Sequence, residues 1–311
     1  MPFTLRRALL GTAFLLAAPA AASAQAPPCD TQGPAGAAYA TGVNCRTLQL
    51  DGHQRRYKVY VPANARRNAP VVFMFHGASG NGERFLKISG WREQADATGL
   101  IAVFPTGERY RITETGRLET RWASFGILEE IEEAETPPAD DVAFVDAMLA
   151  DLSPLHVNER RIYASGFSNG AGMAARLAVD RSETFAAVAF SGGGLPFAQP
   201  TPPRRVPTYA ALGSLDDRVL AKQDPPLAEL PMNPRRILAN PVLGAYLDVA
   251  LETLGLERSP VAVVVRRGTT SFRWPPRRPL LRFTMIEGLE HKYPEGAARG
   301  FWSFFSQHRL P

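Results

Sequence analysis

The stretch that decides the fold covers residues 161–170 and reads RIYASGFSNG. Residues 161–165 are apolar enough for a buried strand, and residues 171–179 favour a helix. Between them lies GFSNG, a G-x-S-x-G pattern at a strand-to-helix turn. Glycines on both sides let the backbone turn sharply, so Ser168 should be raised above the sheet edge as a nucleophile. In the alternative, Ser168 merely caps the helix.

Strand-like and helix-like stretches alternate on both sides of this turn. The predicted strands are 56–62, 70–75, 99–105, 161–165, 185–190, 208–212 and 281–286, and residues 261–266 and 272–274 could form a hairpin. The predicted helices are 91–98, one capped by Asp140 or Asp141, 171–179, about 243–254, and a C-terminal helix carrying Phe301, Trp302, Phe304 and Phe305. Residues 56–62 alternate in polarity as an exposed strand would. This order predicts an α/β fold, with a mostly parallel sheet, helices on both faces, and active-site loops at the carboxyl ends of the strands.

Composition excludes several classes of protein. The chain has 311 residues, of which 45% are hydrophobic and 21% charged, so it is neither disordered, collagenous nor a coiled coil. Its net charge of +5 is small and its arginines form no dense basic block, which argues against nucleic-acid binding. Two cysteines are too few for a four-cysteine zinc site. Without a metal-ligand cluster or a dinucleotide motif, we expect neither metal nor cofactor.

Residues 1–24 have the pattern of a signal peptide. Arg6 and Arg7 precede a short apolar run, and Ala22-Ser23-Ala24 resembles a cleavage site. We therefore expect a secreted or periplasmic protein whose residues 25–311 form a single catalytic domain, with 25–50 as an N-terminal extension. Loss of the two arginines lowers the net charge to +3.

Export gives the two cysteines a meaning. Cys29 and Cys45 are the only available pair, and an oxidising compartment favours a disulfide between them. Closing so short a loop is worth roughly 3 kcal/mol in the chain-entropy model. The alternative is a pair of free thiols.

A serine nucleophile needs a histidine as its base. Three of the five histidines are expected at the surface: His53, His156 and His308. His76 and His291 both follow predicted buried strands. His291 lies downstream of Ser168, as the chain order serine, acid, histidine requires, and is therefore the predicted base. The ring of His76 is expected to brace the loop that follows it.

The acid is expected after the strand 208–212, where the chain reads GSLDDRV. We choose Asp216, with Asp217 facing solvent or pairing with Arg218, although two adjacent aspartates leave the assignment open. Its role would be to orient the imidazole and stabilise its charged form. Asp140 and Asp141 precede the serine and are interpreted as helix caps.

An oxyanion formed during acyl transfer needs fixed donors. The backbone amide of Asn169, directly after the serine, is one candidate. Ala78, in the loop after the strand 70–75, is the second, with Ser79 as its rival.

An ordered series of short motifs runs through the chain. They are YKVYVP at 57–62, HGASGNG at 76–82, GW at 90–91, DDVAF at 140–144, GFSNG at 166–170, GSLD at 213–216 and HKYP at 291–294. Together they resemble the esterase/polyhydroxybutyrate depolymerase family of α/β-hydrolases, which includes bacterial feruloyl and acetyl-xylan esterases. The resemblance covers roughly residues 56–306 and is weak over 220–280.

The resemblance implies roles for particular residues. Ser168, Asp216 and His291 fall at the family's triad positions. Trp122 falls where the family often has an aromatic residue near the substrate cleft, so that Trp122 and His76 are candidate substrate-binding residues; the alternative for Trp122 is a packed loop aromatic. Family members usually carry Pro after the triad aspartate, where this chain has Asp217.

The expected function is that of a serine esterase working through an acyl-enzyme intermediate on feruloyl, acetyl or hydroxyalkanoate-type esters. Secreted polymer depolymerases tend to carry a linker and a polymer-adsorbing domain, for which we find no segment. A small, oligomeric or polysaccharide-linked ester is therefore a better substrate than crystalline polyester. We expect neither nucleic acid nor, after signal removal, a membrane as partner. The alternatives are an α/β-hydrolase peptidase and an exported binding protein with a vestigial site.

Overall fold

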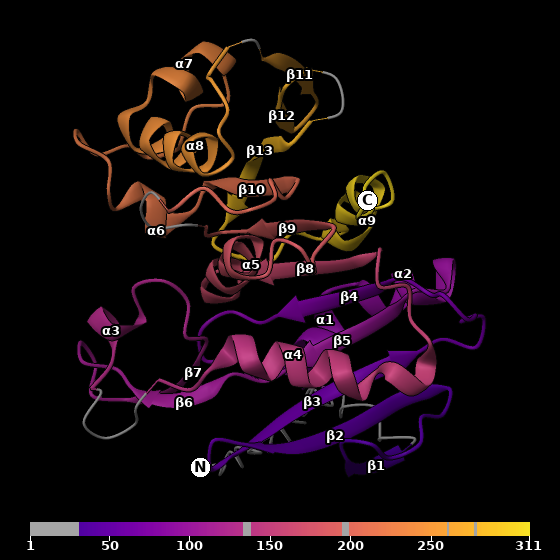
Figure 1. Ribbon diagram of the computed structural model, residues 1–311. Coiled ribbons are helices and arrows are strands. Elements are labelled where there is room, and N and C mark those ends of the chain that lie inside the picture. Colours follow the sequence, from indigo (N-terminus) through magenta and orange to yellow (C-terminus); the bar gives the residue numbers. More distant parts are fainter. Residues whose placement is uncertain (1–30, 133–137, 195–198, 260, 277–278) are drawn as a thin grey trace, which may run out of the picture.

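One mixed sheet of eleven strands runs through the part of the chain that the computed structural model describes (Figure 1). The described residues are 31–132, 138–194, 199–259, 261–276 and 279–311. The predicted signal peptide and Cys29 lie outside them, so the signal peptide and the disulfide with Cys45 stay predictions. The order of the strands is β1-β2-β3-β5-β4-β8-β9-β10-β13-β12-β11.

The centre of the sheet is parallel, as predicted. Its six parallel strands are β5 (Ile101–Pro105), β4 (Val71–Phe75), β8 (Ile162–Phe167), β9 (Ala187–Ser191), β10 (Thr208–Leu215) and β13 (Leu281–Glu290). Strands β4, β5, β8 and β9 are buried along nearly their whole length, which explains their continuous apolar sequences. All six end at the same edge of the sheet.

Each flank of the sheet carries an antiparallel hairpin. Strands β2 (Gly42–Leu50) and β3 (His53–Val61) form the hairpin next to β5, and β1 (Thr31–Pro34) pairs with β2 in parallel. At the other flank, β12 (Thr269–Trp274) and β11 (Ala262–Arg266) form the predicted hairpin beside β13. Within the predicted N-terminal extension, residues 31–34 and 42–50 are therefore strands of the sheet. Strand β3 lies between β2 and β5, and its residues alternate between buried and partly or fully exposed, which agrees with the predicted alternation.

Helices cover both faces of the sheet. On one face lie α4 (Asp141–Asp151), α5 (Asn169–Asp180), α7 (Pro234–Ala239) and α8 (Pro241–Thr253), and on the other lie α1 (Gly82–Ile88), α2 (Trp91–Thr98) and α9 (Ala297–Phe305). Alternate residues of β4 divide between the two cores: Phe73 packs on the α4–α5 side and Met74 on the α1–α2 side. The remaining short elements are α3 (Ile127–Glu130), α6 (Asp217–Leu220) and the separate hairpin of β6 (Glu108–Arg111) and β7 (Leu118–Arg121).

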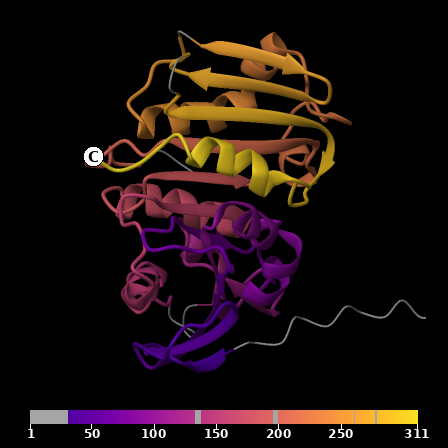
Figure 2. The same cartoon turned by 90° about the vertical axis from the view of Figure 1, so that its right-hand side faces the viewer.

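The C-terminal helix packs on the core, as its aromatic residues predicted. Figure 2 shows α9 lying across one face of the sheet. Phe305 is buried, and its ring stacks on Tyr163 at a centroid distance of 4.7 Å. His308 just beyond the helix is partly buried rather than on the surface, and this burial lowers its pKa to about 4. Within the described ranges, no helix combines the length and the apolar character that crossing a bilayer requires.

Candidate active site

Ser168 lies at a strained turn between β8 and α5. Its backbone has φ 53° and ψ −120°, a positive φ that side-chain-bearing residues rarely adopt. A Cβ on Gly166 would lie 2.0 Å from the carbonyl oxygen of Gly170, and a Cβ on Gly170 would lie 2.3 Å from that of Phe75. Only glycine fits at either position, so the two glycines of the motif are required by the close approach of three backbone segments.

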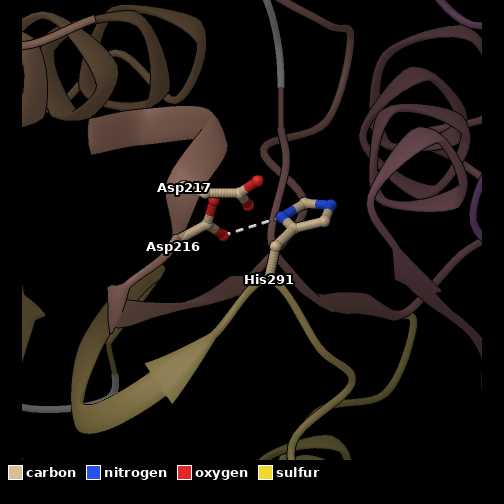
Figure 3. Close-up of side chains that lie close together, drawn as sticks. All are labelled: Asp216, Asp217 and His291. Atoms are coloured by element: carbon tan, nitrogen blue, oxygen red, sulfur yellow. Dashed lines mark hydrogen bonds and ion pairs between the residues drawn. The ribbon is translucent and has the colours of Figure 1, made fainter. Parts of the chain in front are cut away.

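The strand register brings the predicted acid and base together. Strands β10 and β13 pair in parallel, and a register shift between Gly213 and Leu215 sets Leu215 opposite Glu290. The residues that follow this pair are Asp216 and His291. His291 Nδ1 and Asp216 Oδ2 are 2.8 Å apart (Figure 3). Since a carboxylate only accepts hydrogen bonds, this contact assigns the proton to Nδ1.

The other nitrogen of His291 faces the serine. Nε2 lies 2.9 Å from Ser168 Oγ, so with Nδ1 protonated it can accept the hydroxyl proton. The side chain of His291 is 18% exposed and that of Asp216 only 2%. The structure therefore brings Asp216, His291 and Ser168 into one chain of hydrogen bonds that reaches from the interior to the surface.

Asp217 takes a different position from Asp216. Asp216 caps α6 by accepting a hydrogen bond from the amide of Arg218 at 3.1 Å, which fixes its carboxylate. Asp217 is exposed, in agreement with the prediction that it faces solvent or pairs with Arg218. Of the two carboxylates, Asp216 is the one hydrogen-bonded to the imidazole in Figure 3.

Asp216, Asp217 and His291 could also be considered as metal ligands. They offer ligand atoms within 4.8 Å of one another. A cation bound to His291 Nδ1 would displace the proton that this nitrogen donates to Asp216. His291 therefore cannot bind a metal through Nδ1 and donate a proton from Nδ1 to Asp216 at the same time. The contact between Nε2 and Ser168 favours the role in proton transfer.

Two backbone amides near Ser168 are available for an anion. Across the described residues, neither the amide of Ala78 nor that of Asn169 has a hydrogen-bond acceptor. The amide of Ser79 donates to the carbonyl of Thr120 at 2.9 Å, and is therefore occupied. Of the two alternatives left open by the sequence, Ala78 is the better placed donor.

Trp122 and His76 lie beneath the site rather than at its surface. Both side chains are fully buried. Trp122 Nε1 donates to the carbonyl of His76 at 2.9 Å, and the Asn169 side chain accepts from the Trp122 amide at 2.7 Å. The structure thus does not expose either residue to a substrate; it places them where they hold the loop of Ala78 against the serine turn.

His76 is held as a neutral imidazole. Its Nε2 accepts a hydrogen bond from the amide of Gly107 at 2.9 Å, so the proton lies on Nδ1, which donates to the carbonyl of Gly77 at 2.7 Å. Burial lowers the pKa of His76 to about 4, because a charged ring loses its hydration there. The predicted bracing role of this ring agrees with both contacts.

A buried ion pair that the sequence did not reveal holds the segment of Trp122 and Ala123. Asp140 caps α4, as expected, by accepting from the amides of Val142 and Ala143. Asp141 is not a cap: it is fully buried, pairs with the buried Arg55, and accepts from the Ala123 amide at 2.6 Å. Burial raises the pKa of Asp141, and Arg55 opposes the shift. Because Arg55 and Asp141 lie 86 positions apart, no local pattern could predict the pair.

A pocket of about 600 Å³ lies next to the turn of Ser168, and the residues that line it neighbour Ser168 and His291 without including them. It begins at Gly192, where a Cβ would lie 3.2 Å from the His291 ring, and at Gly193, packed against the Ser168 carbonyl. Its walls are mostly apolar and include Leu212, Val219, Val242, Leu243, Tyr246 and Val249. Tyr246 donates to the carbonyl of Gly193 at 2.5 Å, which fastens α8 to the site. The sequence did not predict this wall, because the region after residue 217 lacks a regular pattern.

Known proteins are similar to this chain over about half of its sequence and in its fold. The model of the family described as esterase PHB depolymerase matches residues 55–200, and the resemblance to this family is confirmed. "Putative esterase NocK" of Nocardia uniformis subsp. tsuyamanensis is 28% identical over 55% of this chain and 48% of its own. The bifunctional acetylxylan esterase/xylanase XynS20E of Neocallimastix patriciarum is 25% identical over 53% of this chain and 22% of its own. The chain thus spans half or less of these relatives.

The solved structures define the fold. The acetyl xylan esterase of Aspergillus awamori superposes with a TM-score of 0.57 at 14% identity, over 81% of this chain and 94% of that one. The chain therefore has the α/β-hydrolase fold, as predicted. In this fold the carboxyl edge of the parallel strands carries the active site, and Ser168, Asp216 and His291 all lie there.

Proposed function

We propose that the protein is an exported serine esterase that uses Ser168 as nucleophile, His291 as base and Asp216 as the acid that orients it. The observation that carries this proposal is the continuous path from Asp216 Oδ2 through the imidazole to Ser168 Oγ, with contacts of 2.8 and 2.9 Å. A positive φ at the serine supports it, because that strain is typical of a nucleophile at a strand-to-helix turn. Export rests on the signal-peptide pattern of residues 1–24.

The reaction follows from these positions. As Ser168 Oγ bonds to the ester carbonyl carbon, His291 Nε2 takes the hydroxyl proton, and the buried carboxylate of Asp216 stabilises the imidazolium. The negative charge on the carbonyl oxygen is met by the amides of Ala78 and Asn169. His291 then passes its proton to the departing alkoxide, which leaves as the alcohol. Water attacks the acyl-enzyme with His291 again as base, which releases the acid and restores the serine.

The pocket suggests which part of the substrate is recognised. Its apolar wall beside Ser168 suits the hydrocarbon part of an acyl group, since contacts of this kind require no polar partner. The names of the relatives, among them an acetylxylan esterase and "Probable feruloyl esterase C" of Aspergillus niger, suggest esters on plant polysaccharides. We therefore propose carboxylic esters of small or polysaccharide-linked alcohols as substrates.

The test is the substitution Ser168→Ala. We expect kcat/KM for p-nitrophenyl butyrate to fall by about 10⁴-fold or more, because the nucleophile is lost while binding contacts remain. Ser165→Ala is the matched control: Ser165 is buried within β8, three residues before Ser168, and its loss should leave turnover near the wild-type rate.

A fluorophosphonate probe adds a second measurement. It should label the wild type and Ser165→Ala but not Ser168→Ala. Turnover that survives in Ser168→Ala would exclude the proposed nucleophile. A wild type that neither reacts with the probe nor hydrolyses any ester in a panel of acetyl, butyryl, feruloyl and hydroxybutyrate substrates would instead support a binding protein with a vestigial site.

A further inference from the structure

A second pocket, unrelated to the serine, lies at the other flank of the sheet. Strands β11, β12 and β13 and helix α9 enclose about 370 Å³. The strand register sets Arg273 directly opposite Arg282, and Arg266 opposite Thr269. All three arginines line the pocket, together with hydroxyl groups of Thr269, Ser271 and Ser303. Figure 2 shows α9 on this face of the strands.

This pocket is lined by three arginines and, among the described residues, by no acidic residue. Within the described ranges, none of the three guanidinium groups pairs with a carboxylate. Over residues 258–286 the sequence has seven arginines and no aspartate, glutamate or lysine. Like charges placed opposite each other on neighbouring strands destabilise a sheet. An anion bound between them would remove that cost.

Arg282 is held in place for such an anion. Its guanidinium lies 4.4 Å from the centre of the Tyr209 ring, which fixes the side chain without using its hydrogen-bond donors. Its Nε is buried and has no hydrogen-bond partner among the described residues. A buried donor without an acceptor costs free energy, and a ligand oxygen could satisfy it.

We propose that this pocket binds the carboxylates of an acidic polysaccharide, a chain that contains uronic acid units. Guanidinium groups bind carboxylates through paired hydrogen bonds, and the interleaved hydroxyls of Thr269 and Ser303 can bind sugar hydroxyls. No aromatic side chain lines the pocket on which a nucleic-acid base could stack, which disfavours a single strand of nucleic acid. The exposed Val263 and Val265 lie on the other face of β11, since side chains alternate along a strand.

The position of the pocket separates it from the catalytic site. Arg282 is near the start of β13 and His291 directly follows its end, so nine residues of strand separate the two by at most roughly 30 Å. A polymer bound at the pocket would therefore be held by one segment while an ester on another reaches Ser168. The choice of a polysaccharide rests on the proposed function, whereas the anion site does not.

The test measures binding rather than turnover. The purified full chain is run by affinity electrophoresis in gels containing polygalacturonate or, in parallel, neutral arabinoxylan. We expect retardation by polygalacturonate alone, and we expect the variant R266Q/R273Q to bind about 10-fold or more weakly, since each lost guanidinium removes charge-assisted hydrogen bonds to a carboxylate. R235Q/R236Q, on α7, loses the same charge elsewhere and should bind like the wild type.

Further experiments identify which anionic group is bound and separate a loss of binding from a loss of folding. Heparin and polyphosphate test whether sulfate or phosphate is bound instead; stronger retardation by either than by polygalacturonate would overturn the assignment to carboxylates. Equal binding by R266Q/R273Q and the wild type, or equal losses in both double variants, would overturn the pocket. Hydrolysis of p-nitrophenyl butyrate should be unchanged in both variants, which verifies folding. If R266Q/R273Q fails to fold, R266Q alone, at an exposed position of the edge strand, replaces it.

This binding result is separate from the esterase proposal. Ser168→Ala should bind polygalacturonate as the wild type does, because Ser168 lies at the other end of the strands. If Ser168→Ala kept its ester hydrolysis, the catalytic proposal would fail. The measured binding would still show whether the pocket binds an acidic polysaccharide. If the wild type hydrolysed esters without binding polygalacturonate, only the pocket proposal would fail.

Discussion

The serine turn and the aspartate–histidine pair reach the same edge of the sheet by different means. Ser168 is positioned by its own segment, because Gly166 and Gly170 approach backbone so closely that the chain can turn in one way only. Asp216 and His291 are 75 positions apart and meet only because β10 and β13 pair in one register. The position of Ser168 thus depends on residues next to it in the sequence, whereas the positions of Asp216 and His291 depend on the pairing of two distant strands. Substitutions in the two regions should therefore fail in different ways.

Beyond the loss of Ser168 itself, the largest effect is expected at the aspartate–histidine pair that the sheet assembles. Asp216→Asn should lower kcat for p-nitrophenyl butyrate by about 10⁴-fold, because an amide at this position favours the wrong imidazole tautomer. The fold should persist, since Asn can still cap α6. Asp217→Asn is the matched control and should change kcat less than a few fold, because its side chain is exposed. If Asp217→Asn caused the larger loss, the two aspartates would have to exchange roles.

The second largest effect is expected at the turn around Ser168, where a substitution should lower the free energy of unfolding. In Gly170→Ala the new Cβ would lie 2.3 Å from the Phe75 carbonyl and 2.4 Å from that of His76, and both contacts are with backbone that cannot move aside cheaply. Overpacking of this kind costs about 3 kcal/mol, at the upper end of the usual range. Urea unfolding followed by circular dichroism measures it.

A glycine without such neighbours serves as the control for the turn. Gly300, in α9, has no atom within 4 Å of an added Cβ, so Gly300→Ala should raise the free energy of unfolding by up to about 1 kcal/mol. An equal loss in both variants would mean that glycine flexibility, rather than close approach, explains Gly170.

The smallest effect is a pH dependence of stability beneath the turn. The pKa of His76 is about 4 in the folded protein, against 6.5 for a solvated histidine in the unfolded chain, so below pH 6.5 the unfolded chain binds a proton that the folded protein does not. Stability from this residue is therefore complete above pH 6.5 and declines as the pH falls toward 4, by roughly 1 kcal/mol at pH 5.5.

Paired variants isolate this contribution. His76→Gln should show a shallower loss of unfolding free energy between pH 7 and pH 5 than the wild type, measured by urea titration at each pH. His156→Gln, at an exposed position, should keep the wild-type slope. An identical slope in all three proteins would show that His76 is solvated in solution and not held neutral between Gly77 and Gly107.

The sequence predicted most of what depends on neighbouring residues. The buried strands, the helix 91–98 and the C-terminal aromatic helix were expected from their apolar patterns and are confirmed. Strand β2 was missed, because its polar and apolar residues do not alternate regularly and it follows a Gly/Ala/Pro-rich segment. Helix α1 and the hairpin of β6 and β7 were also missed, because short polar elements carry little hydrophobic periodicity.

For the candidate site, the sequence by itself determined the turn at Ser168 and a short set of partners. A turn is decided by local sterics, so two glycines around a serine between an apolar strand and a helix are enough to predict it. Only the tertiary structure decided that Asp216 rather than Asp217 contacts His291, that Trp122 and His76 are buried, and that Arg55 meets Asp141. These depend on strand register and on contacts between distant segments, and local sequence carries no record of either.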